Sequence, residues 1–266
     1  MARLPTEVNV NKTEEYRSQL RTLTAWEPYL LRESRLPGPR GNLELAHAVA
    51  EEGDAALFWQ LSKYDAERAP TNTPGEFLAF CGVLGLGKLL VEGHADALEA
   101  LRRHASDPRW RTREAVAMAL QRLGAHDMSR LLEAVRPWVN GGLLEQRAVA
   151  AALCEPALLG DKAYARDVLD ILDAITASLE TTENRRNDAY RALRQGLAYC
   201  WSVAVVASPE EGKLLMEKWL TGEDPDVRWI MKENLKKQRL KRMDAAWVEH
   251  MVCRVQEEEG RRKNAE

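Results

Sequence analysis

Two similar segments, whose first residues lie 117 positions apart, constrain the fold of this chain more than any other feature of its sequence. The first is DPRWRTREAVAMALQRL (107–123) and the second is DPDVRWIMKENLKKQRL (224–240). A helical pattern that recurs within one chain predicts a fold built from repeated units. Six of the 17 positions are identical: Asp107 and Asp224, Pro108 and Pro225, Arg111 and Arg228, Gln121 and Gln238, Arg122 and Arg239, and Leu123 and Leu240.

Apolar residues recur at steps of three and four along most of the chain. In 161–180 they are Tyr164, Val168, Leu172, Ile175 and Leu179, and 184–205 has the same spacing. This spacing places apolar side chains on one face of an α-helix. No stretch combines sustained alternation of apolar and polar residues with the turn dipeptides that separate strands. We therefore predict an all-α fold without a sheet.

Capping residues followed by proline mark several helix starts. TPGE (73–76) and SPEE (208–211) each place a Thr or Ser cap before Pro at the first helical position and Glu at the third. The two Asp-Pro pairs have a similar form, so we predict that Asp107 and Asp224 are N-caps. Between these starts and the glycine-containing stops lie helices of about 12–20 residues with short links, which favours antiparallel helix pairs.

A turn Asp followed by Pro, then an Arg and an Ala-rich second helix, resembles the pattern of HEAT repeats. Here it consists of Asp107-Pro108, Arg113, Ala115 and Ala119-Leu120, and it recurs from Asp224 to Arg228. The resemblance covers 95–159 and 208–240, and is only architectural elsewhere. It implies a right-handed α-α superhelix, a HEAT-like solenoid of antiparallel helix pairs whose second helices line a concave face. It implies no chemistry.

The domain prediction follows from this pattern. We expect a single HEAT-like domain over 1–255, in which 1–41 contains N-terminal helices and the start of a Pro/Gly-rich loop. The loops RLPGPRGN (35–42) and APTNTPG (69–75) are expected to set angles between helices rather than to bind a ligand. The segment from 256 to 266, QEEEGRRKNAE, is expected to be a disordered polar tail.

Basic residues gather in the second helices, although the whole chain has a net charge of −3. Segment 228–242 contains seven cationic side chains and one Glu, whereas the first-helix segment 161–183 has six acids and two bases. A basic concave surface suits a polyanion such as a nucleic-acid backbone. The alternative is that these cations form the Asp–Arg contacts between repeats or are merely solvated. The predicted partner-binding or polyanion-binding residues are Arg109, Arg113, Arg186, Arg194, Arg228, Lys232, Lys236 and Arg239.

Two Trp–Glu pairs share a spacing of four residues, Trp110 with Glu114 and Trp229 with Glu233, so each pair lies on one helix face. The spacing is similar to that of Trp and Asp in the HEAT-like alkylpurine DNA glycosylases. That distant resemblance implies an aromatic ring against the sugar of the damaged nucleotide and a carboxylate that stabilises the cation that forms as the base leaves. Glu114 and Glu233 are then the catalytic candidates, although the family uses Asp. The alternative is that both indoles pack between repeats.

GVLGLGKL (82–89) nearly fits a phosphate-binding P-loop. It follows a helix start rather than a strand, and Leu89 lacks the hydroxyl that binds magnesium. We therefore interpret its glycines as the small face of a helix that another backbone approaches closely. The four cysteines and five histidines are scattered, which predicts no disulfide framework and no metal site. We predict no cofactor.

The longest uncharged runs, near 77–87 and 196–209, are shorter than a membrane span of about 18 residues, so we predict no membrane segment and a cytoplasmic location. The leading functional prediction is a non-catalytic scaffold that binds an unidentified protein partner through a concave face. The alternative is a nucleic-acid-binding protein, with DNA glycosylase activity as its enzymatic form.

Overall fold

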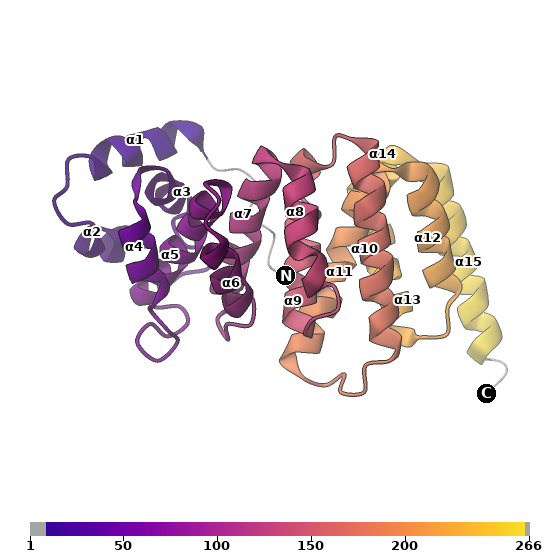
Figure 1. Cartoon of the computed structure of the whole chain (residues 1–266). Helices are drawn as coiled ribbons and strands as arrows, with labels where there is room; N and C mark the ends of the chain where they lie inside the picture. The colour runs from indigo at the N-terminus through magenta and orange to yellow at the C-terminus, as the bar shows by residue number, and fades with distance from the viewer. Residues whose placement is uncertain (1–8, 264–266) are drawn as a thin grey trace. The chain divides into compact units, whose positions relative to one another are not determined.

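The computed structural model describes residues 9–263, in which every regular element is a helix and none is a strand. The all-α prediction is therefore confirmed for this part of the chain. Contacts divide the chain into two compact units, Met1–Asp127 and Met128–Glu266 (Figure 1). Each unit has a buried apolar core of its own. The prediction of a single domain over 1–255 stays a prediction.

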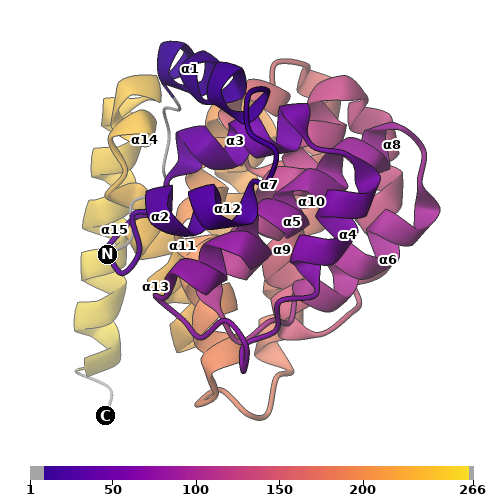
Figure 2. The same ribbon diagram turned by 90° about the vertical axis from the view of Figure 1, so that its left-hand side faces the viewer.

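Unit 1 is arranged around one apolar helix, α5, which contacts α2, α3, α4, α6 and α7. Helices α3, α5 and α7 form a row, because α5 contacts both of the others. Figure 2 shows α4 and α6 to one side of α5. The helices are α1 (Val10–Leu20), α2 (Glu27–Glu33), α3 (Leu43–Glu52), α4 (Ala55–Ser62), α5 (Pro74–Val91), α6 (Ala95–His104) and α7 (Trp110–His126).

Unit 2 repeats this plan around α11, which contacts α9, α10, α12, α13 and α14. Helices α9, α11 and α13 form a row, and α10 and α12 lie in front of it in Figure 1. The helices are α8 (Met128–Val135), α9 (Leu143–Leu153), α10 (Lys162–Glu180), α11 (Asp188–Ala207), α12 (Pro209–Thr221), α13 (Pro225–Leu235), α14 (Gln238–Met243) and α15 (Ala245–Lys263), with short 3-10 turns at Arg136–Trp138 and Pro156–Leu158.

The glycines of 82–89 lie inside α5, which agrees with the interpretation that they form the small face of a helix. A Cβ added to Gly82 would come within 2.3 Å of the Ser62 backbone nitrogen at the end of α4. One added to Gly87 would come within 2.7 Å of Ala119 in α7. Lys88 donates hydrogen bonds to the Glu51 and Gly53 carbonyls at the end of α3 (2.9 and 3.0 Å). These residues therefore serve packing and helix capping.

Helix α5 is also the one described helix that is long and apolar enough to cross a membrane. The uncharged run within it is shorter than a span, but the whole helix of 18 residues meets the length and hydropathy criteria. This 18-residue helix is 78% buried inside the protein, which is typical of a core helix.

The predicted helix starts agree with the structure except at Asp107. Thr73, Ser208 and Asp224 are N-caps, and the Asp224 carboxylate accepts hydrogen bonds from the Asp226 and Val227 backbone N–H groups. Helix α7 instead begins at Trp110 with Arg109 as its N-cap. The Asp107 carboxylate binds the backbone N–H and the guanidinium of Arg109, so the prediction for Asp107 is wrong.

The second repeated segment, 224–240, forms two helices rather than one. Helix α13 ends at Leu235, and α14 begins at Gln238 after a tight turn in which Lys237 N–H donates to the Asn234 carbonyl. The fully buried Asn234 side chain bridges two backbone groups of α11, accepting from Ser202 N–H and donating to the Leu197 carbonyl.

The C-terminal prediction also needs correction. Helix α15 continues to Lys263, so residues 256–263 are helical rather than a disordered tail. Residues 264–266 lie outside the described part of the chain. The helices and the Pro/Gly loop expected within 1–41 are present from residue 9 onward.

The close approach of α4 to α5 gives a test. Gly82→Ala should lower the free energy of unfolding of unit 1 by about 1–3 kcal/mol, because the added methyl overlaps backbone atoms that cannot move away independently. Urea unfolding followed by circular dichroism measures the change. Gly196→Ala is the matched control. Gly196 stands at the same position from the N-cap in α11, and its added Cβ meets only Arg147 Cγ at 3.6 Å. This change should be neutral or stabilise by up to about 1 kcal/mol; equal losses in both variants would contradict the packing argument.

Candidate functional site

The predicted site residues fall into two groups. Arg109, Trp110, Arg113 and Glu114 lie at the start of α7 in unit 1. The larger group lies in unit 2, where the structure brings residues of α11, α13 and α14 together through the contacts of α11. Its members are Arg194, Arg228, Trp229, Lys232, Glu233, Lys236 and Arg239, and Arg186 precedes α11.

Arg109 lies in the interior of unit 1 and is only 1% exposed. Its guanidinium binds the Asp107 carboxylate (2.7 Å) and donates to the Asp65 and Ala69 carbonyls (both 3.1 Å). Those carbonyls belong to the connection between α4 and α5. Arg109 therefore fastens this connection to the start of α7, and it does not present a cation to a partner as predicted.

Arg111, two residues later, joins the two Pro/Gly loops. It binds the buried Glu76 carboxylate (3.0 Å) and the Gly38 carbonyl (2.6 Å). Gly38 N–H in turn donates to the side chain of Asn72, which has a positive φ of 64°. The loops 35–42 and 69–75 are thus held together by one guanidinium and one amide, which agrees with their predicted structural role.

Arg113 and Arg228 occupy equivalent positions. Their contacts give an alignment of the two repeats that differs from the alignment of the identical residues. Arg113 donates to the carbonyls six and five residues before it (2.6 and 3.0 Å), and Arg228 does the same (3.0 and 2.9 Å). The helix starts Trp110 and Pro225 agree with this alignment. The structural offset is therefore 115 residues, two fewer than the offset of the identical residues.

Burial supports the offset of 115. Ala115, Val116, Ala119 and Leu120 are buried in α7, and so are their counterparts Ile230, Met231, Asn234 and Leu235 in α13. The two Trp–Glu pairs are consequently not equivalent, because Trp110 is the first residue of its helix and Trp229 is the fifth. Nothing in the two repeats relates them as copies of one site.

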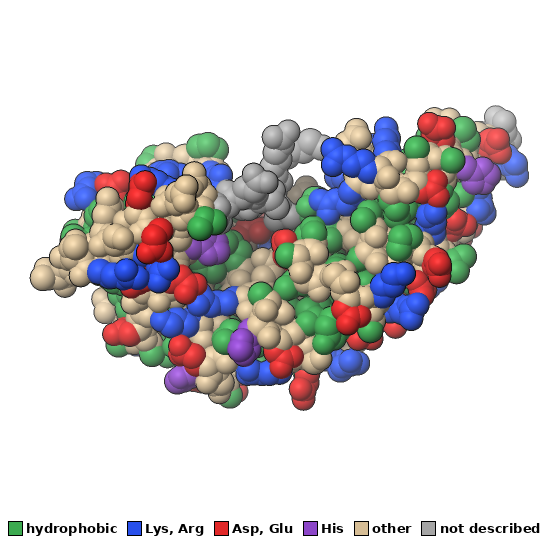
Figure 3. All heavy atoms as spheres, turned by 90° about the horizontal axis from the view of Figure 1, so that it is seen from above, with side chains coloured by type: hydrophobic (Ala, Val, Ile, Leu, Met, Phe, Trp, Pro, Cys, Tyr) green, Lys and Arg blue, Asp and Glu red, His purple; other side chains and the backbone are tan. Residues whose placement is uncertain are grey.

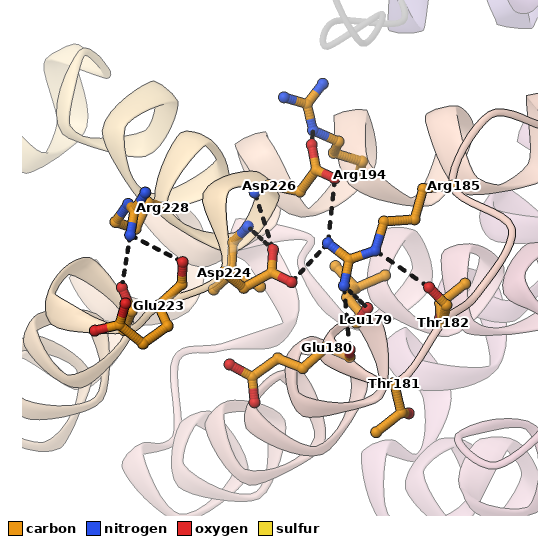
Figure 4. Close-up of polar contacts among 12 residues, drawn as sticks. Leu179, Glu180, Thr181, Thr182, Arg185, Arg194, Glu223, Asp224, Asp226 and Arg228 are labelled. Carbon is orange, nitrogen blue, oxygen red and sulfur yellow. Dashed lines mark hydrogen bonds and ion pairs between the residues drawn. The ribbon is translucent and has the colours of Figure 1, made fainter. Parts of the chain in front are cut away.

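In unit 2, a cluster of polar contacts surrounds Asp224 and Asp226 at the start of α13 (Figure 4). Arg185 binds Asp224 (2.6 Å) and Asp226 (3.4 Å). It also donates to the carbonyls of Leu179, Glu180 and Thr182, where α10 ends. Arg185 thus fastens the end of α10 to the start of α13, the task that Arg109 performs in unit 1.

Asp226 has two further partners on α11. Arg194 Nε lies 2.8 Å from one carboxylate oxygen, and the Tyr190 hydroxyl donates to the other (2.9 Å). Burial and this hydrogen bond raise the pKa of the Tyr190 phenol well above its usual value. The sequence predicts Arg186 and Arg194 as ligands for a polyanion, whereas the structure pairs Arg194 and its neighbour Arg185 with Asp226. The Asp-x-Asp sequence at 224–226 is the signal that could have identified their intramolecular partners.

Two arginine–aromatic stacks connect α11 to the helices that follow it. The Arg194 guanidinium lies 3.6 Å from the centre of the Trp229 ring on α13. The Arg239 guanidinium of α14 lies 4.6 Å from the Tyr199 ring and donates to its hydroxyl (2.6 Å). Such stacks are attractive because the aromatic face is electron-rich. They show that Arg194, Trp229 and Arg239 contribute to packing within unit 2.

Both Glu residues of the Trp–Glu pairs have intramolecular contacts. Glu233 forms an ion pair with Lys236, the C-cap of the same helix, and the Glu233 side chain is 19% exposed. Glu114 is half-buried. Trp110 is 41% exposed and stacks on Arg111 at 4.4 Å, so the expectation that its indole is buried between repeats is wrong.

Three cations in or next to α14 have no intramolecular side-chain partner among the described residues. Lys241 and Arg242 are exposed and Lys237 is half-buried. Within residues 9–263, none of their side chains forms a hydrogen bond, an ion pair or an aromatic contact. Arg186 is also exposed and its side chain has no such contact in that range. In each unit, the face drawn in Figure 3 shows cationic side chains interspersed with acidic and apolar ones.

No group of three or more His, Cys, Asp or Glu side chains among the described residues is arranged to hold a metal ion. Comparison with known proteins gives no family assignment. No family model and no curated protein matches this chain. Two engineered proteins of known crystal structure are similar, at 18% and 16% identity, with TM-scores of 0.34 and 0.35. The alignments cover 88% of this chain and 98% and 99% of theirs. At these TM-scores the similarity carries no argument about fold or function.

A pair of arginine variants separates the structural cations from the exposed ones. Arg109→Met should lower the free energy of unfolding of unit 1 by about 3–5 kcal/mol, because it removes the guanidinium that pairs with the Asp107 carboxylate and binds the Asp65 and Ala69 carbonyls. Arg186→Met, which removes an exposed cation, should change it by no more than about 0.5 kcal/mol. Denaturant unfolding measures both values. Similar small effects would show that Arg109 does not fasten α7.

Proposed function

We propose that this chain is a non-catalytic helical-repeat protein that binds an acidic protein partner through the α11–α13–α14 face of unit 2. We also propose that residues 1–255 form a right-handed, HEAT-like superhelix. It is supported by the alternation of helices between two layers in each unit. The cytoplasmic location also remains part of the proposal.

The observation that carries the proposal is that Lys237, Lys241 and Arg242 lie in the same short segment as Arg239, whose guanidinium stacks on Tyr199. Arg, Trp and Tyr are enriched at the energetic centres of protein interfaces. Charges at the edge of such a surface steer an oppositely charged partner toward it. Because these three cations have no intramolecular partner in the described part of the chain, a partner's carboxylates can bind them without breaking a native ion pair.

Nucleic-acid binding is the second candidate, and the same three cations favour it. Phosphate groups bind Lys and Arg with release of counterions, which makes the affinity depend steeply on salt. Several of the cations that the sequence predicts to bind a polyanion are less suited to binding phosphate. Arg194, Arg228 and Arg239 are engaged by a carboxylate, by backbone carbonyls and by a tyrosine, respectively.

Charge-removal variants test both candidates with two probes, a fluorescent polyglutamate peptide and a 20-base-pair duplex DNA. The variant Lys237→Gln, Lys241→Gln, Arg242→Gln should weaken polyglutamate binding about tenfold at low salt, since each exposed pair contributes about 0.5 kcal/mol. Fluorescence anisotropy gives the dissociation constants.

The matched control is Arg136→Gln, Lys162→Gln, Arg166→Gln, which removes three exposed cations of unit 2 that lie outside α11, α13 and α14. It should leave binding unchanged. Tighter binding of DNA, with a log–log salt slope of about −0.9 per phosphate contacted, would favour the nucleic-acid candidate. Binding of neither probe at about 50 mM salt would contradict both candidates.

The glycosylase prediction is tested separately. We expect the wild-type protein to release no base from alkylated duplex DNA, because Arg194 stacks on the Trp229 ring and Lys236 binds the Glu233 carboxylate. Mass spectrometry of the released bases checks this. Base release by the wild type that disappears in Glu233→Gln or Glu114→Gln, without loss of folding, would establish an enzymatic function.

A further inference from the structure

Arg185 and Arg194 bind the same carboxylate, that of Asp226, but they use their guanidinium donors differently. Arg185 also binds Asp224 and donates to three backbone carbonyls where α10 ends. Arg194 has one ion contact, between its Nε atom and Asp226 at 2.8 Å, and its N–H groups form no well-aligned hydrogen bond with a described residue. Its Nε atom is buried, whereas the whole side chain is 26% exposed. The unused donors at the exposed end are therefore the Nη groups.

Two contacts fix the orientation of the Arg194 guanidinium. Its centre lies 3.6 Å from the centre of the Trp229 ring on α13, and its Nε atom lies against Asp226 at the start of the same helix. In Figure 4 the Nη atoms of Arg194 point away from Asp226. A guanidinium that is stacked on a ring and paired at one edge loses little further freedom when its other edge binds a ligand. Helices α11 and α13 thus hold a planar fork of donors ready for an acceptor.

The charges around this fork favour a single carboxylate over a phosphate backbone. Asp224 and Asp226 balance the charges of Arg185 and Arg194, so these four side chains together have no net charge. A nucleic acid would bring several closely spaced phosphates toward the two carboxylates, and their repulsion opposes binding. One carboxylate instead accepts two parallel hydrogen bonds from the Nη groups, a geometry that the planar guanidinium matches.

We propose that the Nη groups of Arg194 bind a glutamate or aspartate side chain of the acidic protein partner through two parallel hydrogen bonds. This inference rests on the proposed function and adds to it the residue that orients the partner. Lys237, Lys241 and Arg242 attract the partner through their charge, whereas Arg194 fixes the position of one carboxylate. Salt distinguishes the two contributions, because it screens exposed charges much more than a directional hydrogen bond at a partly buried group.

The test compares Arg194→Lys with the wild type, using the fluorescent polyglutamate peptide at about 50 mM and about 200 mM salt. Lysine keeps the charge beside Asp226 but cannot form the fork. We expect the dissociation constant to rise about tenfold at both salt concentrations, which is the lower end of the range for hydrogen bonds between charged groups. Fluorescence anisotropy measures it.

The matched control is Arg166→Lys on α10. Arg166 also pairs with a carboxylate through its Nε atom, that of Glu211 at 2.7 Å, and it lies outside the proposed binding face. This change should leave binding unaltered at both salt concentrations.

A measurement on the wild type keeps the test independent of how well the variant folds. In protein that contains isotope-labelled arginine, the Nε–H resonance of Arg194 is identified by its Overhauser contacts with the Trp229 ring. We expect this resonance to shift when polyglutamate is added, because the Nη groups of the same guanidinium bind a carboxylate. An unchanged resonance at saturating peptide would overturn the inference.

The remaining outcomes separate this inference from the proposed function. The inference alone fails if Arg194→Lys keeps wild-type affinity while the loss of Lys237, Lys241 and Arg242 weakens binding. It also fails if the effect of Arg194→Lys disappears at the higher salt concentration, since Arg194 would then act only as a charge. Binding of duplex DNA that depends on Arg194 would assign the fork to a phosphate instead. No binding of polyglutamate by the wild type would contradict the proposed function as well.

Discussion

In both units, one guanidinium joins the connection before the central helix to the start of the helix beside it. A helix end leaves carbonyl groups without intrahelical partners, and a loop leaves more. Arg109 binds such carbonyls between α4 and α5 together with Asp107. Arg185 binds those at the end of α10 together with Asp224 and Asp226. The arginine comes from a different segment in each case, but the two ends joined are equivalent.

These arginine contacts change the interpretation of the basic segments. The basic segments look like surfaces for a polyanion, yet many of their arginines bind carbonyls, carboxylates or aromatic rings of the same unit. The cations left for a partner in the described residues are a smaller set that includes Lys237, Lys241 and Arg242. A small set of cations suits selective contact with an acidic protein better than extended contact along a phosphate backbone. We therefore propose the acidic protein partner before nucleic acid.

The two central helices meet their neighbours by different means at equivalent positions. In unit 1, Gly87 of α5 faces Ala119 of α7, and the absence of side-chain atoms allows the backbones to approach closely. In unit 2 the corresponding residues are Trp201 and Asn234. Trp201 fills the core and donates to Thr176, while Asn234 bridges backbone groups of α11. One architecture is thus maintained by close backbone packing in one repeat and by buried hydrogen bonds in the other.

The sequence by itself determined the helical class, the helix starts at Thr73, Ser208 and Asp224, and the packing role of the glycines in 82–89. Each of these depends on local spacing and capping, which a single stretch of chain contains. The register of 115 residues, the burial of Arg109 and the contact of Arg185 with Asp224 were settled only by the packing of distant segments. These depend on contacts between segments tens of residues apart, and identical residues do not reveal them. Asp107 shows the reason: the same Asp-Pro pair caps a helix at 224, but at 107 its carboxylate binds a buried arginine that the other repeat lacks.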